Sequence, residues 1–173
     1  MKSVHTPHGG KLSIARILSG TVNDGIELIT SGGASVKVSG IYRMLGTQQT
    51  KLSSASTGET VALGKLDDAR TGDTLAADKS PPKALGAPEY LHAVFAVALR
   101  PRERKDDVKL SAALQKLGQE DPALGIEQNQ DSGETVLSGH GEMHLRVAVE
   151  RLEGKCQIPV ESYVPSVPYR ETI

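Results

Sequence analysis

Two histidines and a glutamate lie close together in the segment GHGEMHL, residues 139–145, and such a set could bind zinc. A zinc protease places His-Glu-x-x-His on one helix, with the glutamate directly after the first ligand, where it activates water. Here Glu142 is displaced by one position, and His140 lies between two glycines, before the expected helix. No obvious third ligand is offered by the other histidines, His5, His8 and His92. We therefore expect no metal site.

The same segment has the pattern of a turn that begins a helix. Gly139 and Gly141 would let the backbone bend sharply and approach a neighbour closely, and Glu142 would lie in the first helical turn, where a carboxylate suits the helix dipole. His144 and Arg151 would lie about 20° apart around that helix. This polar line flanks a predicted apolar face formed by Leu145, Ala148, Val149 and Leu152. The line is either solvated or covered by a neighbouring domain, and the residues alone leave both alternatives open.

The apolar pattern around this segment predicts two helices and four strands. One helix follows Asp106, the expected N-cap, and stops at Pro122. The other begins after Gly141 and stops at Gly154. Strands are predicted by the runs at 89–101, 124–130, 134–139 and 156–165. The resulting order, βαββαβ, is the split βαβ arrangement of ferredoxin-like α+β domains, in which two helices cover one face of a four-stranded sheet.

Residues 1–79 have a different residue pattern, in which short runs of β-branched residues are interrupted by glycines at brief intervals. This pattern is typical of an all-β unit, and a small closed barrel is the predicted fold, with a sandwich as the alternative. The Asn-Asp-Gly segment at 23–25 is expected to form a hairpin turn. Prolines in residues 80–88 exclude helix and sheet there and predict a linker, so that residues 89–173 form the second domain.

Composition excludes several classes of protein. The formal net charge of −1 over 173 residues gives no global attraction to nucleic acid or membrane. The longest apolar run, residues 93–99, is far shorter than the ~20 residues of a membrane-spanning helix. The single cysteine, Cys156, cannot form an internal disulfide. We therefore expect a cytoplasmic protein with no membrane partner, in which this thiol is a core residue.

Longer motifs resemble one known family. GHGEMHL with RL six residues on, EDPAL and SGETVLSG before it, and PSVPYRETI at the end resemble the third domain of the elongation factor G family of translational GTPases. GKLSIARILSG and TGETVALGKLDDARTGDTL in the first half resemble the family's second domain, a β-barrel shared among translation factors. The match covers nearly the whole chain in the family's order. Departures from the usual family version at His140, Met143 and Ala148 suggest a divergent member or a G-like paralogue.

The resemblance implies a non-catalytic middle fragment of a ribosome-dependent GTPase. In the family, GTP-driven rearrangement on the ribosome moves transfer RNA and messenger RNA, and these two domains relay between the GTPase domain and the distal domains. The sequence holds no G-x-x-x-x-G-K-[ST] loop, so GTP and Mg are expected only in the parent protein, with no cofactor or catalytic residue in this fragment. A role in ribosome recycling, or another specialised role, is the alternative.

By position, the resemblance implies that the turn and its helix face the parent's GTPase domain. The residues so assigned are Gly139, Gly141, Glu142, His144, Leu145 and Arg151. In the family this region also lies near the small subunit of the ribosome and forms part of a pocket for a fusidane antibiotic. The fragment itself is expected to be a monomer.

The segment RPRERKDD, residues 100–107, concentrates positive charge in one predicted loop. Such a loop can bind phosphates. The candidates for RNA contact are Arg100, Arg102, Arg104 and Lys105. Three acidic neighbours in the same loop dilute this charge, so a solvated loop is the alternative. The resemblance favours contact, because it implies that this domain meets small-subunit RNA and protein.

Two other functions are less favoured by the residues. An acylphosphatase also has the ferredoxin-like arrangement, but it needs a glycine-rich phosphate loop after the first strand, and ALRPRERKDD contains no glycine. A stand-alone RNA-binding module would need exposed aromatic residues on the barrel. Tyr42 is the only Phe, Trp or Tyr in residues 1–79.

Overall fold

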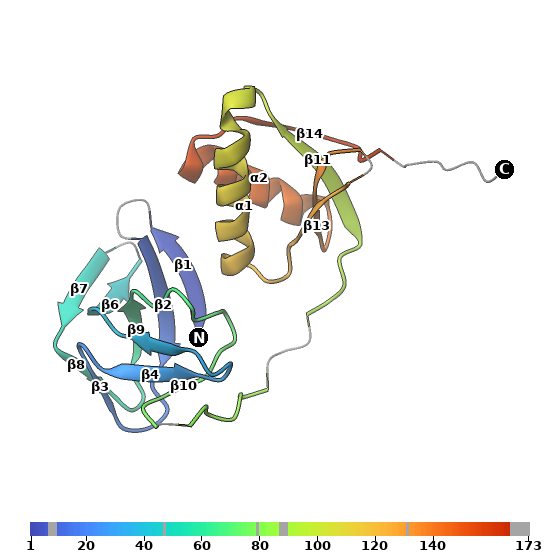
Figure 1. The fold of residues 1–173 in the computed structure, drawn as a ribbon. Helices are drawn as coiled ribbons and strands as arrows, with labels where there is room; N and C mark the ends of the chain where they lie inside the picture. Colours follow the sequence, from blue (N-terminus) through green and yellow to red (C-terminus); the bar gives the residue numbers. More distant parts are fainter. Residues whose placement is uncertain (7–9, 47, 79, 87–89, 131, 167–173) are drawn as a thin grey trace. The chain divides into compact units, whose positions relative to one another are not determined.

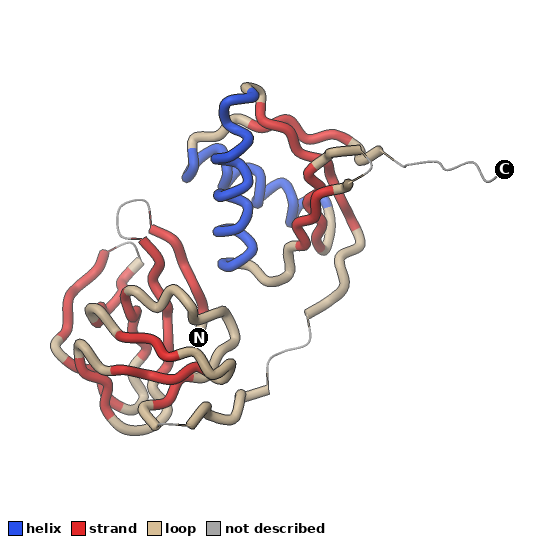
Figure 2. The backbone as a smooth tube through the Cα atoms, viewed as in Figure 1, coloured by secondary structure: helices blue, strands red, loops and turns tan. Residues whose placement is uncertain are grey.

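Residues 1–88 and 89–173 form two structural units in this computed structural model. The structure describes residues 1–6, 10–46, 48–78, 80–86, 90–130 and 132–166. Strands run throughout the first unit, and the second unit combines a sheet with two helices (Figure 1, Figure 2). The predicted domain boundaries fall on residues 79 and 87–89, which lie outside the described residues.

Three antiparallel sheets surround the core of the first unit. The largest has the strand order β1-β2-β9-β6-β7, the second has the order β10-β4-β5, and β3 pairs with β8. The strands are β1 Lys2–Thr6, β2 Gly10–Arg16, β3 Thr21–Asn23, β4 Glu27–Thr30, β5 Ser35–Lys37, β6 Ile41–Leu45, β7 Gln48–Leu52, β8 Ser54–Ser56, β9 Thr60–Gly64 and β10 Leu75–Ala76. They enclose one aliphatic cluster, Ile17, Leu28, Val36, Val38, Ile41, Ala55, Val61, Leu63, Leu66 and Ala69. The unit is the predicted β-barrel.

The turn at 23–25 exists, but the hairpin predicted there is wrong. Gly25 has φ +83°, the left-handed conformation that favours glycine. The strands on either side are not partners, because β3 pairs with β8 and β4 pairs with β5 and β10. Asp24 Oδ1 accepts a hydrogen bond from the Gly40 N–H at 2.7 Å, and the Gly25 N–H donates to Val38 O at 3.0 Å. These bonds join the turn to the segment after β5 and direct β4 away from β3.

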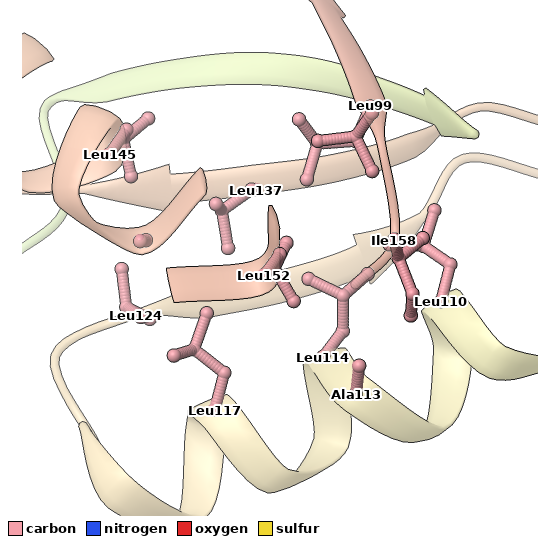
Figure 3. Packing of buried hydrophobic residues seen from close by; sticks show 12 residues of the cluster. Leu99, Leu110, Ala113, Leu114, Leu117, Leu124, Leu137, Leu145, Leu152 and Ile158 are labelled. Carbon is pink, nitrogen blue, oxygen red and sulfur yellow. The ribbon is translucent and has the colours of Figure 1, made fainter. Parts of the chain in front are cut away.

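The second unit has one four-stranded antiparallel sheet in the order β12-β13-β11-β14. Its elements are β11 Phe95–Pro101, the 3₁₀ turn η1 Arg104–Asp106, α1 Asp107–Glu120, β12 Gly125–Gln128, β13 Thr135–Gly139, α2 Glu142–Cys156 and β14 Val160–Tyr163. This order confirms the predicted ferredoxin-like fold. Both helices pack against the sheet through one core (Figure 3), formed by Leu99, Leu110, Ala113, Leu114, Leu117, Leu124, Leu137, Leu145, Ala148, Leu152, Ile158 and Val160.

Both helices have ends that differ from simple capping expectations. Asp106 precedes α1 as predicted, but its carboxylate accepts a hydrogen bond from Lys109 Nζ at 2.7 Å instead of capping a helix N–H. The predicted stop of α2 at Gly154 is wrong, because the helix continues through this residue. Its last residue is Cys156, and Gln157, the C-cap, takes the left-handed conformation with φ 54° and donates its N–H to Leu152 O.

Cys156 is the last residue of α2 and is exposed, so the core position predicted for its thiol is wrong. The last buried side chain of the helix is Leu152, one turn earlier. The extra turn therefore carries Cys156 past the core. In the parts of the chain that the structure describes, no helix is long and apolar enough to span a bilayer.

Candidate domain interface at the start of α2

The two glycines before α2 have different roles. Gly139 is the buried last residue of β13, and a Cβ there would lie 2.8 Å from both His144 Nδ1 and Leu145 Cδ2. Such a contact is too short for packed atoms, so only glycine lets the first turn of α2 lie this close to the strand. Gly141 has extended backbone with φ 161° and ψ 177°, and a Cβ there would meet nothing within 4 Å. The predicted close approach therefore depends on Gly139 alone.

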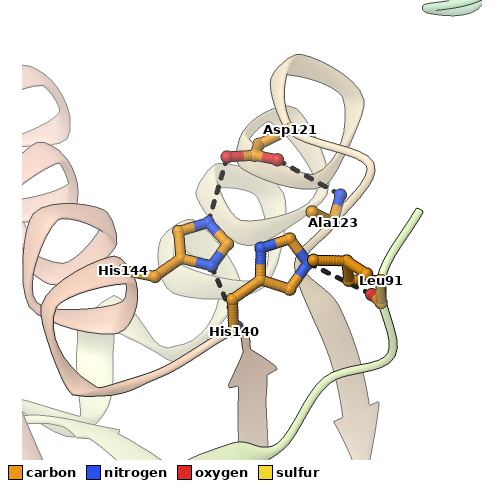
Figure 4. Close-up of polar contacts among 5 residues, drawn as sticks. All are labelled: Leu91, Asp121, Ala123, His140 and His144. Atoms are coloured by element: carbon orange, nitrogen blue, oxygen red, sulfur yellow. Dashed lines mark hydrogen bonds and ion pairs between the residues drawn. The ribbon is translucent and has the colours of Figure 1, made fainter. Parts of the chain in front are cut away.

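His144, in the first turn of α2, has hydrogen bonds at both ring nitrogens (Figure 4). Nδ1 accepts from the backbone N–H of His140 at 3.2 Å, and Nε2 lies 3.1 Å from Asp121 Oδ2. Because a backbone N–H can only donate, Nδ1 carries no proton, and the neutral ring donates from Nε2 to Asp121. The side chain is 23% exposed. His144 is therefore not simply solvated, since it joins α2 to the turn between α1 and β12.

Asp121 is the acidic end of this network. Burial raises the pKa of the Asp121 carboxyl, but hydrogen bonds from His144 and from the Ala123 N–H, with the positive charge of Arg151 nearby, bring the net pKa below its usual value. The Ala123 N–H donates to Asp121 Oδ1 at 3.1 Å. The carboxylate thus stays ionised at neutral pH and polarises the His144 ring, which makes Nδ1 a better acceptor.

His140 is exposed, and its ring joins a different part of the chain. Its Nε2 lies 3.1 Å from Leu91 O and must donate, because a carbonyl only accepts. The two histidine rings have centroids 5.1 Å apart. No group of three or more His, Cys, Asp or Glu side chains that could hold a metal ion occurs among the described residues. Within the described residues, three of the four ring nitrogens hold hydrogen bonds, two with backbone groups and one with the Asp121 carboxylate.

The outward face of α2 carries apolar side chains that were not predicted to take part in a site. Met143 is 64% exposed and Val147, one turn later, is 40% exposed. Glu142 and Arg151 are exposed on either side of this pair. Residues four apart lie on one helix face, and neighbouring exposed apolar side chains mark a surface that a partner can cover. The i, i+4 spacing of Met143 and Val147 was the signal in the sequence.

The six residues predicted to face a neighbouring domain differ in their solvent exposure. Glu142 and Arg151 are exposed, and Gly141 and His144 are partly exposed. Gly139 is buried, and Leu145 is 2% exposed in the core of its own unit. A neighbouring domain would therefore meet the polar residues and the Met143 side chain, with Leu145 supporting that surface from beneath.

Two of the four predicted RNA contacts are already paired. Arg100 donates from Nε and Nη2 to Glu161 Oε2 at 2.9 and 2.8 Å, and its guanidinium lies 5.4 Å from the centroid of the Tyr163 ring. Lys105 forms an ion pair with Glu103 at 2.5 Å. These pairs are exposed and can exchange partners at little cost.

Arg102 and Arg104 complete the predicted set, and both are exposed. Within the described residues neither forms a salt bridge. These two side chains are therefore the cations of the loop that a phosphate could bind without displacing a carboxylate.

A cavity in the first unit was not predicted from the sequence. Its volume is about 580 Å³, its lining includes Val22 and Leu75, and the linker residues Pro82 and Leu85 also line it. The Leu85 N–H donates to Thr74 Oγ1 at 3.1 Å. The predicted linker thus begins against the barrel. Such a cavity forms between residues distant in sequence, so no local sequence pattern predicts it.

Comparisons with known proteins match both units. The family model "Elongation factor G domain 2" matches residues 1–78, and "Elongation Factor G, domain III" matches residues 92–163. An "Elongation factor G-like protein" of Synechocystis sp. is 45% identical over 174 aligned residues, which are 100% of this chain and 25% of that protein. A crystal structure from Thermus thermophilus matches 98% of this chain and 26% of its own, with 32% identity and a TM-score of 0.83. The chain thus spans about a quarter of each relative.

Proposed function

This chain belongs to the elongation factor G family and carries its domains II and III, and from that premise we propose that it serves as a ribosome-binding relay within a translational GTPase. GTP binding is assigned to another part of the parent protein, because the 173 residues contain no phosphate-binding loop. GTP-dependent movement of transfer RNA and messenger RNA would be the work of the whole protein, acting with ribosomes in the cytoplasm.

The observation that carries the relay is the outward face of α2. Its inner face is fully used by the core of the unit, through Leu145, Ala148 and Leu152. Its outer face nevertheless carries the exposed apolar pair Met143 and Val147 between charged residues. We assign this face to contact with the GTPase domain of the parent. Contacts made in only one nucleotide state would couple that state to this unit.

The basic loop between β11 and α1 supports the ribosome-binding part of the proposal. Arg102 and Arg104 can reach phosphates, and each neutralised phosphate adds about one unit to the salt dependence of binding. An Arg102→Ala, Arg104→Ala variant should bind small subunits with a shallower salt slope. Equal slopes for variant and wild type would remove this loop from the ribosome interface.

The relay is tested in the full-length parent protein by Met143→Ser with Val147→Ser. Removing two apolar side chains from a covered surface should cost roughly 1–2 kcal/mol of contact energy, and ribosome-dependent GTP hydrolysis should fall about tenfold. Val108→Ser is the matched control, because Val108 is 81% exposed on the other helix. Unchanged multiple-turnover hydrolysis in the double variant, with the folded state intact, would exclude contact of this face with the GTPase domain.

A specialised role is the second candidate function, because the Synechocystis relative is described as elongation factor G-like. A complementation experiment distinguishes general translocation from a specialised role. If the parent protein supports growth when the main translocation factor is depleted, general translocation is favoured. Failure to complement, combined with normal ribosome-dependent GTP hydrolysis, favours recycling or another specialised role.

A further inference from the structure

Two segments of the second unit lie on its surface beyond the ends of the sheet. The incoming segment, residues 90–94, precedes β11, and the outgoing segment, residues 164–166, follows β14. Leu91 and Val94 are 76% and 78% exposed, and Val164 is 86% exposed. Burial of side chains therefore contributes little to their positions, which depend on their connection to β11 and β14 and on hydrogen bonds.

The incoming segment is attached at the C-terminal end of β13. His140 Nε2 donates to Leu91 O at 3.1 Å, and the Val94 N–H donates to Gly139 O at 2.9 Å. The His140 backbone is itself fixed, because its N–H donates to His144 Nδ1. A series of bonds thus connects the Asp121 carboxylate, through both histidines, to the backbone of the incoming segment, with His140 as the donor toward both ends.

The outgoing segment is attached at the N-terminal end of the same strand. Glu134 accepts the Ser166 N–H at Oε2, at 3.0 Å, and the Ser166 hydroxyl at Oε1, at 2.7 Å. Ser132 Oγ donates to Glu134 Oε2 at 3.0 Å and holds the carboxylate in place. Hydrogen bonds to an ionised carboxylate are stronger than bonds between neutral groups. Two such bonds to one residue fix both its backbone and its side chain.

The two attachments therefore flank one strand, because Glu134 and His140 immediately precede and follow β13. β13 pairs with β12 on one side and β11 on the other, and Leu137 at its centre is 0% exposed. Six residue steps in extended backbone span about 20 Å. We propose that β13 is a rigid spacer that sets the distance between the incoming and outgoing segments, with His140 and Glu134 as its two clamps.

A spacer of this kind would transmit displacement through the unit without deforming it. Movement of residues 90–94 would reach residues 164–166 as a shift of the whole sheet. Its use in a relay between domains rests on the proposed function, but the spacer itself is a property of this chain and can be tested without ribosomes.

Spin labels measure the spacer directly. Leu91→Cys and Val164→Cys, on a Cys156→Ser background, place two labels on exposed positions of the two segments of the full 173-residue chain. We expect a narrow distance distribution. Adding His140→Phe, which keeps a ring but removes the donor, or Glu134→Ala, should each broaden it, and the double variant should broaden it most. Thr74→Val, which removes a hydrogen bond in the barrel, is the control and should leave it unchanged.

Amide hydrogen exchange tests the two clamps separately, each at its own end of β13. His140→Phe should speed exchange of the Val94 amide roughly fivefold, the factor that loss of one hydrogen bond predicts, and leave the Ser166 amide unchanged. Glu134→Ala should speed exchange of the Ser166 amide and leave the Val94 amide unchanged. The exchange rate of the Leu137 amide should stay the same in both variants. A broad distribution with both clamps present, or equal acceleration at all three amides, would overturn the proposal, since the second result would indicate general loss of stability.

Discussion

The two units differ in their buried hydroxyl groups. In the barrel, Ser3 and Ser13 lie opposite each other on β1 and β2, both are 0% exposed, and neither hydroxyl has a hydrogen-bond partner among the described residues. In the second unit, His144 and Glu134 each accept or donate several hydrogen bonds. The barrel therefore holds two buried hydroxyls without a bond among the described residues, although other side chains, such as Lys11 and Asp24, join its distant segments. In the second unit the polar side chains at both ends of β13 have hydrogen-bond partners.

Packing shows the same difference. The barrel has a cavity of about 580 Å³ that is partly open to solvent, whereas the second unit joins two helices and four strands through one continuous leucine-rich core (Figure 3). Substitutions in the lining of that cavity, which is less buried, should therefore cost less than substitutions in the core of the second unit.

The largest effect is expected at the centre of β13. Leu137→Ala removes a fully buried side chain and should lower the free energy of unfolding of the second unit by about 3 kcal/mol. Leu75→Ala, at a partly exposed position beside the barrel cavity, should cost only about 1 kcal/mol. Urea unfolding of each variant measures both. Equal losses would mean that the lining of the barrel cavity is packed as tightly as the core of the second unit.

A smaller loss is expected from Gly139→Ala. Its Cβ would lie 2.8 Å from His144 Nδ1 and Leu145 Cδ2, so α2 must shift, at a cost of roughly 2 kcal/mol. Gly141→Ala is the matched control, because its Cβ would enter open space on extended backbone, and it should change stability by less than about 0.5 kcal/mol. Thermal unfolding of the pair compares them. The assignment of the close approach to Gly139 fails if both substitutions have the same effect.

In the barrel, one pair of substitutions should raise the free energy of unfolding instead of lowering it. Ser3→Ala combined with Ser13→Ala removes two buried hydroxyls that have no partner in the described part of the chain, and we expect the barrel to gain about 1 kcal/mol of stability. Ser19→Ala, at an exposed position, serves as the control and should have no effect. A loss of stability in the double variant, seen in urea unfolding, would show that the hydroxyls are bonded in solution.

The smallest effect is the response of the outgoing segment to pH. Hydrogen bonds from the Ser166 side chain and backbone hold the pKa of Glu134 below its usual 4.5. Because the folded pKa is the lower one, the attachment is complete above pH 4.5 and is lost as the pH falls through the folded value. Ser166 amide exchange, corrected for its intrinsic pH dependence, should be unchanged between pH 7 and 5 and accelerate below 4.5. Glu134→Gln should remove this acceleration, and its persistence in that variant would assign it to another carboxyl.

Local patterns in the sequence were sufficient to predict the helices and strands of the second unit. Leu110, Ala113, Leu114 and Leu117 fixed the inner face of α1, and all four are buried. The glycine-broken strands of the first half likewise predicted a barrel. Such signals succeed because burial of one face is decided by residues a few positions apart.

Pairings between distant residues could not be predicted in this way. β3 pairs with β8, more than thirty residues later, although the turn beside it suggested a hairpin. The bonds of His144 to Asp121 and of Ser166 to Glu134 join residues 23 and 32 positions apart. The stop of α2 at Gln157 was missed because a glutamine has no preference for the left-handed conformation that it takes there. Each of these depends on the completed fold.

The lack of a side chain at Gly139 also sets the stiffness of the junction between β13 and α2. Most helices rest on a sheet through a layer of side chains, whose rotamers can yield under load. At this junction the His144 and Leu145 side chains lie directly against the strand backbone, with no strand side chain between them. One layer of side chains instead of two leaves fewer rotamers that could change when the start of α2 is displaced.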